Sequence, residues 1–172
     1  MKIEINDAYF MRAALDQAQI ALKNGWIPVG SVFVMDKNII GYGAKSGMRH
    51  AVFDHAEHNG CYQLLWDRHG TNNLRGCEVF STLEPCIMCM ALLMKTRVSR
   101  IVYALEDPYG GGSCILSGSL PAQFQQEHPS VERGPFREES RKLLREFFSQ
   151  QPRNGLRWTD RENPLIKLVM DE

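Results

Sequence analysis

The sequence carries no net charge, because its 172 residues include 20 Lys and Arg and 20 Asp and Glu. A protein that coats nucleic acid or an anionic membrane through bulk charge needs an excess of basic residues. The sequence therefore disfavours a protein that binds through bulk positive charge, although equal numbers of acidic and basic residues still allow a local basic patch. It also lacks a run of about 18 apolar residues, so we expect no membrane span. Its first residues lack the apolar segment of a secretory signal.

Cysteine is scarce and odd in number, which disfavours a framework of disulfides. We expect an intracellular, cytoplasmic protein in which these residues are thiols or metal ligands. The length predicts one domain with a short extension, which we assign to residues 1–150 and 151–172. The five cysteines are Cys61, Cys77, Cys86, Cys89 and Cys114.

Hydrophobic periodicity predicts a helix, two strands and then alternating helices and strands, with no internal repeat. This order favours an α/β fold with a mixed sheet covered on both faces. The tail, 155–172, is too apolar to be simply solvated, and we expect it to pack on the body or on a second subunit. The predicted elements are helix 7–23, strands 29–35 and 39–42, helix 56–67, strand 77–82, helix 85–95, strand 100–105, an irregular segment over 107–129, helix 137–149 and a linker at 150–154.

The residues that carry chemistry form two short motifs at the expected starts of two helices. His55 and Glu57 belong to the first, and Pro85, Cys86 and Cys89 to the second. Cysteines at positions i and i+3 of a helix direct both sulfurs to one point, and a helix N-terminus stabilises thiolates. One His and two Cys leave a fourth tetrahedral position for water, which is the arrangement of catalytic zinc.

Glu57 is the residue that we expect to move protons. It follows His55 by two positions, which turns it roughly 200° around a helix, so we do not expect it to bind the metal from the same side. The pattern H-x-E followed by P-C-x-x-C is the signature of zinc nucleobase deaminases. In such a site zinc lowers the pKa of water to about 7, and Glu moves the proton to the ring. We therefore expect an exocyclic amino group to be replaced by a carbonyl, with release of ammonia.

Each motif alone has a simpler interpretation. A C-x-x-C pair is also typical of structural zinc and of redox pairs that follow a strand. Asp54 and Glu57 fit a helix capping box, with Asp in place of Ser or Thr. The two motifs together, with one predicted strand between them, favour a catalytic site with one Zn²⁺ per chain.

The chain resembles the cytidine deaminase superfamily, and within it the bacterial tRNA adenosine deaminase branch, over about residues 7–150. The metal motifs are specific to the superfamily, while the surrounding segments are less specific to the branch. The matching segments are 27–32 (IPVGSV), 55–57 (HAE), 82–89 (TLEPCIMC), 97–103 (RVSRIVY), 106–107 with the glycines that follow, and 143–148 (LLREFF).

This resemblance implies a three-layer α/β/α sandwich around a mixed five-stranded sheet, and a homodimer or larger homo-oligomer. It implies that His55, Cys86 and Cys89 are zinc ligands and that Glu57 is the proton shuttle. It also implies that the backbone N–H of Cys86 helps to hold the attacked ring.

The chain departs from the family pattern in two places. The loop after the hairpin normally carries an Asn that contacts the base, and Ala44 or Lys45 stands there. The helix after H-A-E contains Gly60 between His58 and Cys61. His58 and Cys61 either line a pocket or are a surface His and a buried thiol.

Other residues near the expected entrance are candidates for contact with the substrate. Arg49 and His50 flank this entrance, and Lys45, Arg49 and Arg68 are the only candidates for a phosphate clamp. The candidate substrate contacts are Ala44, Lys45, Asp54, His58, Asp107 and Phe148.

Two hypotheses stand for the substrate. The zero net charge and the absent Asn favour a free nucleobase, nucleoside or related amino-heterocycle. Adenosine in tRNA is the alternative, and a tRNA binder needs a basic stripe. Arg137, Arg141 and Arg145, spaced by four, form one candidate face that neighbouring Glu residues balance. An inactive zinc-binding module is a third hypothesis, against which Glu57 argues.

Overall fold

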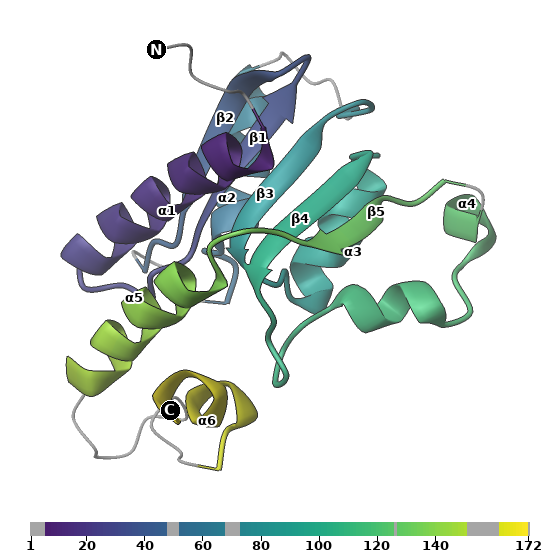
Figure 1. The fold of residues 1–172 in the computed structure, drawn as a ribbon. Helices are drawn as coiled ribbons and strands as arrows, with labels where there is room; N and C mark the ends of the chain where they lie inside the picture. The colour runs from purple at the N-terminus through teal and green to yellow at the C-terminus, as the bar shows by residue number, and fades with distance from the viewer. Residues whose placement is uncertain (1–5, 48–51, 68–72, 126, 151–161, 172) are drawn as a thin grey trace.

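The computed structural model describes residues 6–47, 52–67, 73–125, 127–150 and 162–171. These residues form a five-stranded sheet between helices (Figure 1). Of the helices in these ranges, none has both the length and the apolar character to cross a membrane. The elements are α1 (Asp7–Lys23), β1 (Gly30–Met35), β2 (Asn38–Ala44), α2 (Ala56–Asp67), β3 (Glu78–Leu83), α3 (Ile87–Lys95), β4 (Arg100–Leu105), the 3₁₀ helix η1 (Ser113–Ser117), α4 (Ala122–Gln125), β5 (Ser130–Arg133), α5 (Arg137–Gln150) and α6 (Pro164–Met170).

The sheet has the strand order β2-β1-β3-β4-β5 and is mixed. Strand β1 pairs antiparallel with β2 and β3, while β3, β4 and β5 run parallel. The β1–β2 hairpin turns through Asp36 and Lys37, both of which have positive φ (50° and 62°). Two consecutive residues with positive φ give the turn a backbone twist that matches the twist of the flanking strands. The parallel strands then place the ends of β3 and β4 at the same edge of the sheet.

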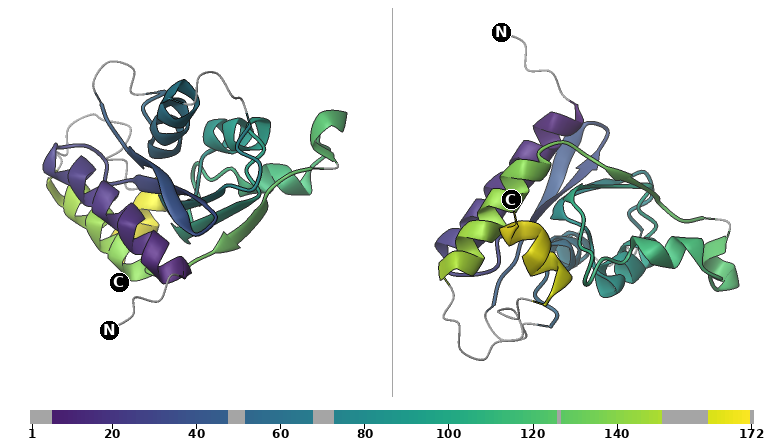
Figure 2. Two further views of the ribbon diagram at one scale, coloured as in Figure 1. Left: turned by 90° about the horizontal axis from the view of Figure 1, so that it is seen from above. Right: turned by 60° about the horizontal axis from the view of Figure 1, so that its bottom comes forward.

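Helices cover both faces of the sheet, with α1 and α5 on one side and α2 and α3 on the other (Figure 2). On the first face Met11 packs with Val32 and Phe80. On the second face Leu93 packs with Phe33, among other residues. Neighbouring residues of one strand point to opposite faces, so Val32 and Phe33 serve two separate cores. The predicted three-layer α/β/α sandwich is confirmed.

Several predicted elements are confirmed with their bounds. Helices 7–23 and 56–67 and strand 100–105 begin and end as predicted, and helix 137–149 is one residue longer. The side chain of Asn6 caps α1 by accepting a hydrogen bond from Tyr9 N at 3.2 Å. The remaining predicted strands differ by one or two residues at their ends.

Three predictions about local structure were wrong. Helix 85–95 begins at Ile87, because Cys86 has extended backbone (φ −68°, ψ 170°) and is the N-cap. The segment predicted to be irregular over 107–129 contains η1 and α4. Strand β5 follows where no strand was predicted. Its only apolar residue is Val131, and it exists by pairing with β4 at the sheet edge.

The C-terminal tail packs on the body through α6. Leu165 and Val169 are buried in one cluster with Leu105 and Leu144. Most of the predicted linker at 150–154 lies outside the described residues. Figure 2 shows α6 beside α5, at the edge of the sheet where β4 ends.

Candidate active site

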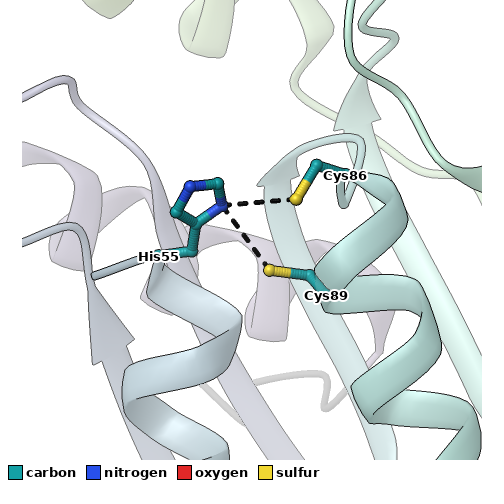
Figure 3. Close-up of side chains that lie close together, drawn as sticks. All are labelled: His55, Cys86 and Cys89. Atoms are coloured by element: carbon teal, nitrogen blue, oxygen red, sulfur yellow. Dashed lines mark hydrogen bonds between the residues drawn. The ribbon is translucent and has the colours of Figure 1, made fainter. Parts of the chain in front are cut away.

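Three potential metal ligands meet where two helices begin (Figure 3). His55 directly precedes α2, while Cys86 occupies the N-cap position of α3 and Cys89 lies in its first turn. The Nδ1 atom of His55 lies 3.4 Å from Cys86 Sγ and 3.6 Å from Cys89 Sγ. Within the described part of the chain, this is the only group of three or more such residues that could hold a metal ion. The structure thus brings together the residues that the two motifs singled out.

The geometry of this group fits zinc. Tetrahedral zinc with ordinary bond lengths holds a nitrogen and a sulfur ligand roughly 3.5 Å apart. The two nitrogen–sulfur separations lie within 0.1 Å of that distance, at 3.4 and 3.6 Å. Imidazole and thiolate are also the ligands that zinc prefers. The three side chains therefore fit the metal that the motifs predict.

The pKa values of the two cysteine thiols are shifted in opposite directions. A hydrogen bond from Cys89 and the neighbouring His55 hold the pKa of Cys86 well below its ordinary value. The pKa of Cys89 is raised in turn, by its hydrogen bond to Cys86 and by burial. Because the thiolate is the form that binds metal, Cys86 is prepared to do so at neutral pH.

Glu57 lies buried beside this group, with 3% of its surface exposed. It accepts a hydrogen bond from Ser81 Oγ at 2.6 Å, across from α2 to β3. Burial raises the pKa of the Glu57 carboxyl, and the Ser81 hydrogen bond opposes part of that shift. A buried carboxyl with a raised pKa exchanges protons more readily near neutral pH, as a general acid and base requires.

A cavity of about 190 Å³ opens at the metal ligands. Lys45 and Glu57 are among its polar lining residues, and its walls are mainly apolar. Pockets for drug-sized ligands have volumes of roughly 300–1,000 Å³. This cavity therefore suits a single heterocyclic base better than a whole nucleotide. The apolar wall residues are Ile27, Val29, Leu83, Phe148 and Leu165.

The glycine-rich loop forms one rim of the cavity and is held by carboxylates. Asp107 accepts hydrogen bonds from Tyr109 N (2.9 Å) and Gly110 N (3.0 Å). Glu84 accepts from Asp107 N at 3.0 Å and from both the backbone N and the hydroxyl of Ser113. A Cβ at Gly111 would lie 2.5 Å from the Glu84 carboxyl, which explains why glycine is needed there.

The structure separates the predicted substrate contacts into two groups. Lys45, Asp107 and Phe148 line the cavity, whereas Ala44, Asp54 and His58 are not among its lining residues. The ring of His58 stacks against Tyr62 instead, with centroids 6.4 Å apart. Arg49, His50 and Arg68 lie outside the described residues.

The departures after H-A-E have structural explanations. Cys61 is fully buried in the core, and burial raises its pKa to about 11. This fits the interpretation as a buried thiol. A Cβ at Gly60 would lie 2.5 Å from the Phe33 ring, so glycine permits close packing of α2 on β1. Asn59, which sequence reasoning missed, donates to Ala44 O (3.0 Å) and to Ser46 Oγ (3.3 Å). It thereby holds the loop that carries Lys45.

The predicted basic face of α5 is engaged within the chain. Arg137 forms an ion pair with Glu106, with 2.6 Å between Nη2 and Oε1. Arg141 and Arg145 donate from Nε to the backbone carbonyls of Leu168 and Val169, each at 2.9 Å. These three residues tie elements of the fold together, so their spacing does not by itself indicate an RNA-binding stripe.

Comparisons with known proteins agree with this geometry. Residues 4–105 match the cytidine and deoxycytidylate deaminase zinc-binding region. The chain is 34% identical over 149 residues to a tRNA-specific adenosine deaminase of Agrobacterium fabrum strain C58, covering 83% of this chain and 94% of that protein.

Solved structures of deaminases are also similar to this chain. One, from studies of A-to-I editing by tRNA:A34 deaminases, has a TM-score of 0.68 and 31% identity, covering 80% of this chain and 99% of the other. The guanine deaminase of Bacillus subtilis has a TM-score of 0.57 and 25% identity, covering 69% and 80% respectively. By sequence and by structure, this chain belongs to the family of cytidine and deoxycytidylate deaminases that carry a zinc-binding region.

Proposed function

We propose that this protein is a zinc-dependent deaminase that converts adenosine in tRNA to inosine. The observation that carries the proposal is the base-sized cavity beside His55, Cys86 and Glu57. Similarity to tRNA-specific adenosine deaminases over most of both chains supports this substrate. The zero net charge and the absent Asn favour a free base instead, whereas the comparisons favour adenosine in tRNA.

The cavity explains why zero net charge is a weak argument against tRNA. Enzymes that act on a base within nucleic acid take up that base alone, turned out of the strand. A cavity of about 190 Å³ with apolar walls suits such a base and leaves the sugar and phosphates outside. The charge of the whole chain therefore says little about what this cavity accepts.

His55, Cys86 and Cys89 would hold the zinc, which when bound lowers the pKa of water at the open position. Glu57 takes a proton from the attacking water and gives it to the ring nitrogen. Ser81 holds Oε1 of Glu57 and thereby fixes the orientation of the carboxyl group. The first proton stays on the ring nitrogen, and Glu57 passes the second proton of the water to the amino group, which leaves as ammonia while the water oxygen becomes the carbonyl on the ring carbon.

The apolar walls have their own part in this reaction. Leu83 and Phe148 keep bulk water from the reacting carbon and strengthen the interactions of Glu57. Lys45 lines the same cavity, and burial lowers the pKa of its ammonium group. Because an ammonium group only donates hydrogen bonds, Lys45 suits an acceptor atom on the substrate.

A free nucleobase is the second candidate substrate. The small cavity accommodates it equally well, and of Ala44 and Lys45, which stand where the family has its base-contacting Asn, Lys45 lines the cavity. To separate the two, purified protein is incubated with tRNA, with free adenine, guanine and cytosine, and with their nucleosides. Inosine in tRNA, detected by sequencing, is the expected result. Release of ammonia from free bases alone would overturn the tRNA substrate.

We also propose one zinc ion per chain, a cytoplasmic location and a homodimer. The single ligand group in the described residues supports the stoichiometry, which elemental analysis tests. The location follows from the proposed tRNA substrate. For the homodimer, exposed aromatic side chains on α2 offer a surface that a second copy would cover.

A further inference from the structure

The wall of the cavity includes a residue from the far end of the chain. Leu165, in α6, lines the same cavity as His55 and Glu57, although more than 100 residues separate it from them. It is 4% exposed. The family resemblance covers about residues 7–150, so α6 lies outside the segment that resembles the family.

The N-terminus of α6 is fixed close to Leu165. Asn163 is buried, and its side chain accepts a hydrogen bond from the backbone N of Leu165 at 2.9 Å. Pro164 occupies the first helical position, where its fixed φ favours the helix and its missing N–H costs nothing. The cap therefore acts directly on the residue that reaches the cavity.

The C-terminal half of α6 is fixed by α5. Arg141 and Arg145 donate from Nε to the carbonyls of Leu168 and Val169, both at 2.9 Å. Arg145 also donates to Asp171 O at 3.2 Å. Carbonyls at the end of a short helix lack partners within it, and these guanidinium groups supply them. Figure 2 shows the resulting placement of α6 beside α5.

Apolar packing sets the depth of Leu165. It shares a buried cluster with Leu105, Leu144 and Val169. Leu105 is the last residue of β4, and the loop that follows it forms the rim of the cavity. Helix α6 is thus held by a cap, by two guanidinium groups and by the core, and each restricts how far Leu165 can move from the cavity.

We propose that α6 is a structural wall of the substrate cavity and that Leu165 determines how large a base the cavity accepts. This proposal rests on the proposed function for its substrate. A rigid apolar wall discriminates by size, and one methylene group in such a pocket changes relative rates by about 10- to 200-fold. Shortening Leu165 should admit larger bases, and lengthening it should exclude the ordinary one.

The test compares Leu165→Ala and Leu165→Phe with Leu168→Ala and Leu168→Phe. Leu168 lies on the same helix and packs on the same cluster, but it is not among the residues that line the cavity. The substrates are an anticodon stem-loop RNA with one target adenosine and the same RNA with a 2-methyl, 2-amino or 8-methyl group on that base. Free purines with these substituents are assayed in parallel.

We expect Leu165→Ala to raise kcat/KM for at least one substituted base, relative to the parent, by about tenfold or more. Leu165→Phe should lower kcat/KM for the parent by a similar factor, mainly through KM. The Leu168 variants should keep the wild-type ratios. Unchanged ratios in both Leu165 variants, or equal changes in the Leu168 variants, would overturn the proposal.

Two further measurements separate the possible failures. Melting temperatures of the Leu165 and Leu168 variants report any loss of folding. If wild-type protein converts free purines but no RNA, the tRNA substrate fails while the size ratios on free purines still test Leu165.

Discussion

At the scale of single residues, Glu57 has the most specific role. Replacing it with Gln keeps the shape and the hydrogen bond from Ser81 but removes the proton-accepting carboxylate. We expect deamination to fall by about 10²- to 10⁴-fold, the usual contribution of general acid–base catalysis. Inosine formation measures the rate, and elemental analysis should find unchanged zinc. A Glu57→Gln variant that keeps both zinc and the wild-type rate would refute the proton transfer.

The two motifs predict the group of metal ligands, because they place His55 at the start of one helix and the two cysteines at the start of another. Ser81, Glu84 and Asn59 were missed for a physical reason. Ser81 and Asn59 bond to partners 24 and 15 positions away, so their roles depend on how strands and loops pack. Glu84 lies in the segment that matched the family, but its contact with Ser113 spans 29 positions. No local pattern encodes such contacts.

At the scale of elements, an ion pair joins the end of β4 to the start of α5. Arg137 holds the pKa of Glu106 down to about 2. The pair therefore stabilises the fold above the ordinary pKa of Glu, and this contribution is lost as the pH falls from about 4.5 towards 2. Because the Arg137 side chain is 39% exposed, we expect only about 1 kcal/mol at pH 7.

Urea unfolding of chelator-treated protein measures this contribution. The free energy of unfolding of Glu106→Gln should lie below that of wild type at pH 7, and the difference should shrink at pH 3. Glu139→Gln is the control, because its pair with Arg12 is longer, at 3.9 Å, and exposed on both sides. A difference that stays constant between pH 7 and pH 3 would contradict the assignment.

Elements also differ in how far local sequence determines them. Helices α1 and α5 follow from periodicity, because each packs one apolar face on other elements. Strand β5 does not follow, since one apolar residue gives no alternation and its hydrogen bonds come from β4. The apolar tail predicted packing for α6, but periodicity cannot reveal that Leu165 reaches the cavity.

At the scale of the whole molecule, α2 presents an exposed aromatic surface. Tyr62 and Trp66 are 59% and 73% exposed, and their rings stack with centroids 6.0 Å apart. Exposed apolar side chains that gather in this way mark interaction sites. We predict that a second copy of the chain covers them, in the homodimer that the family resemblance implies.

Light scattering on the purified protein tests this assembly. We expect the mass of two chains for wild type and of one chain for Trp66→Glu, because a buried unpaired carboxylate costs an interface several kcal/mol. Ile20→Glu is the control, since Ile20 is exposed on α1, on the other side of the sheet. This variant should remain a dimer. A wild-type protein with the mass of one chain, or a dimeric Trp66→Glu variant, would exclude this surface as the interface.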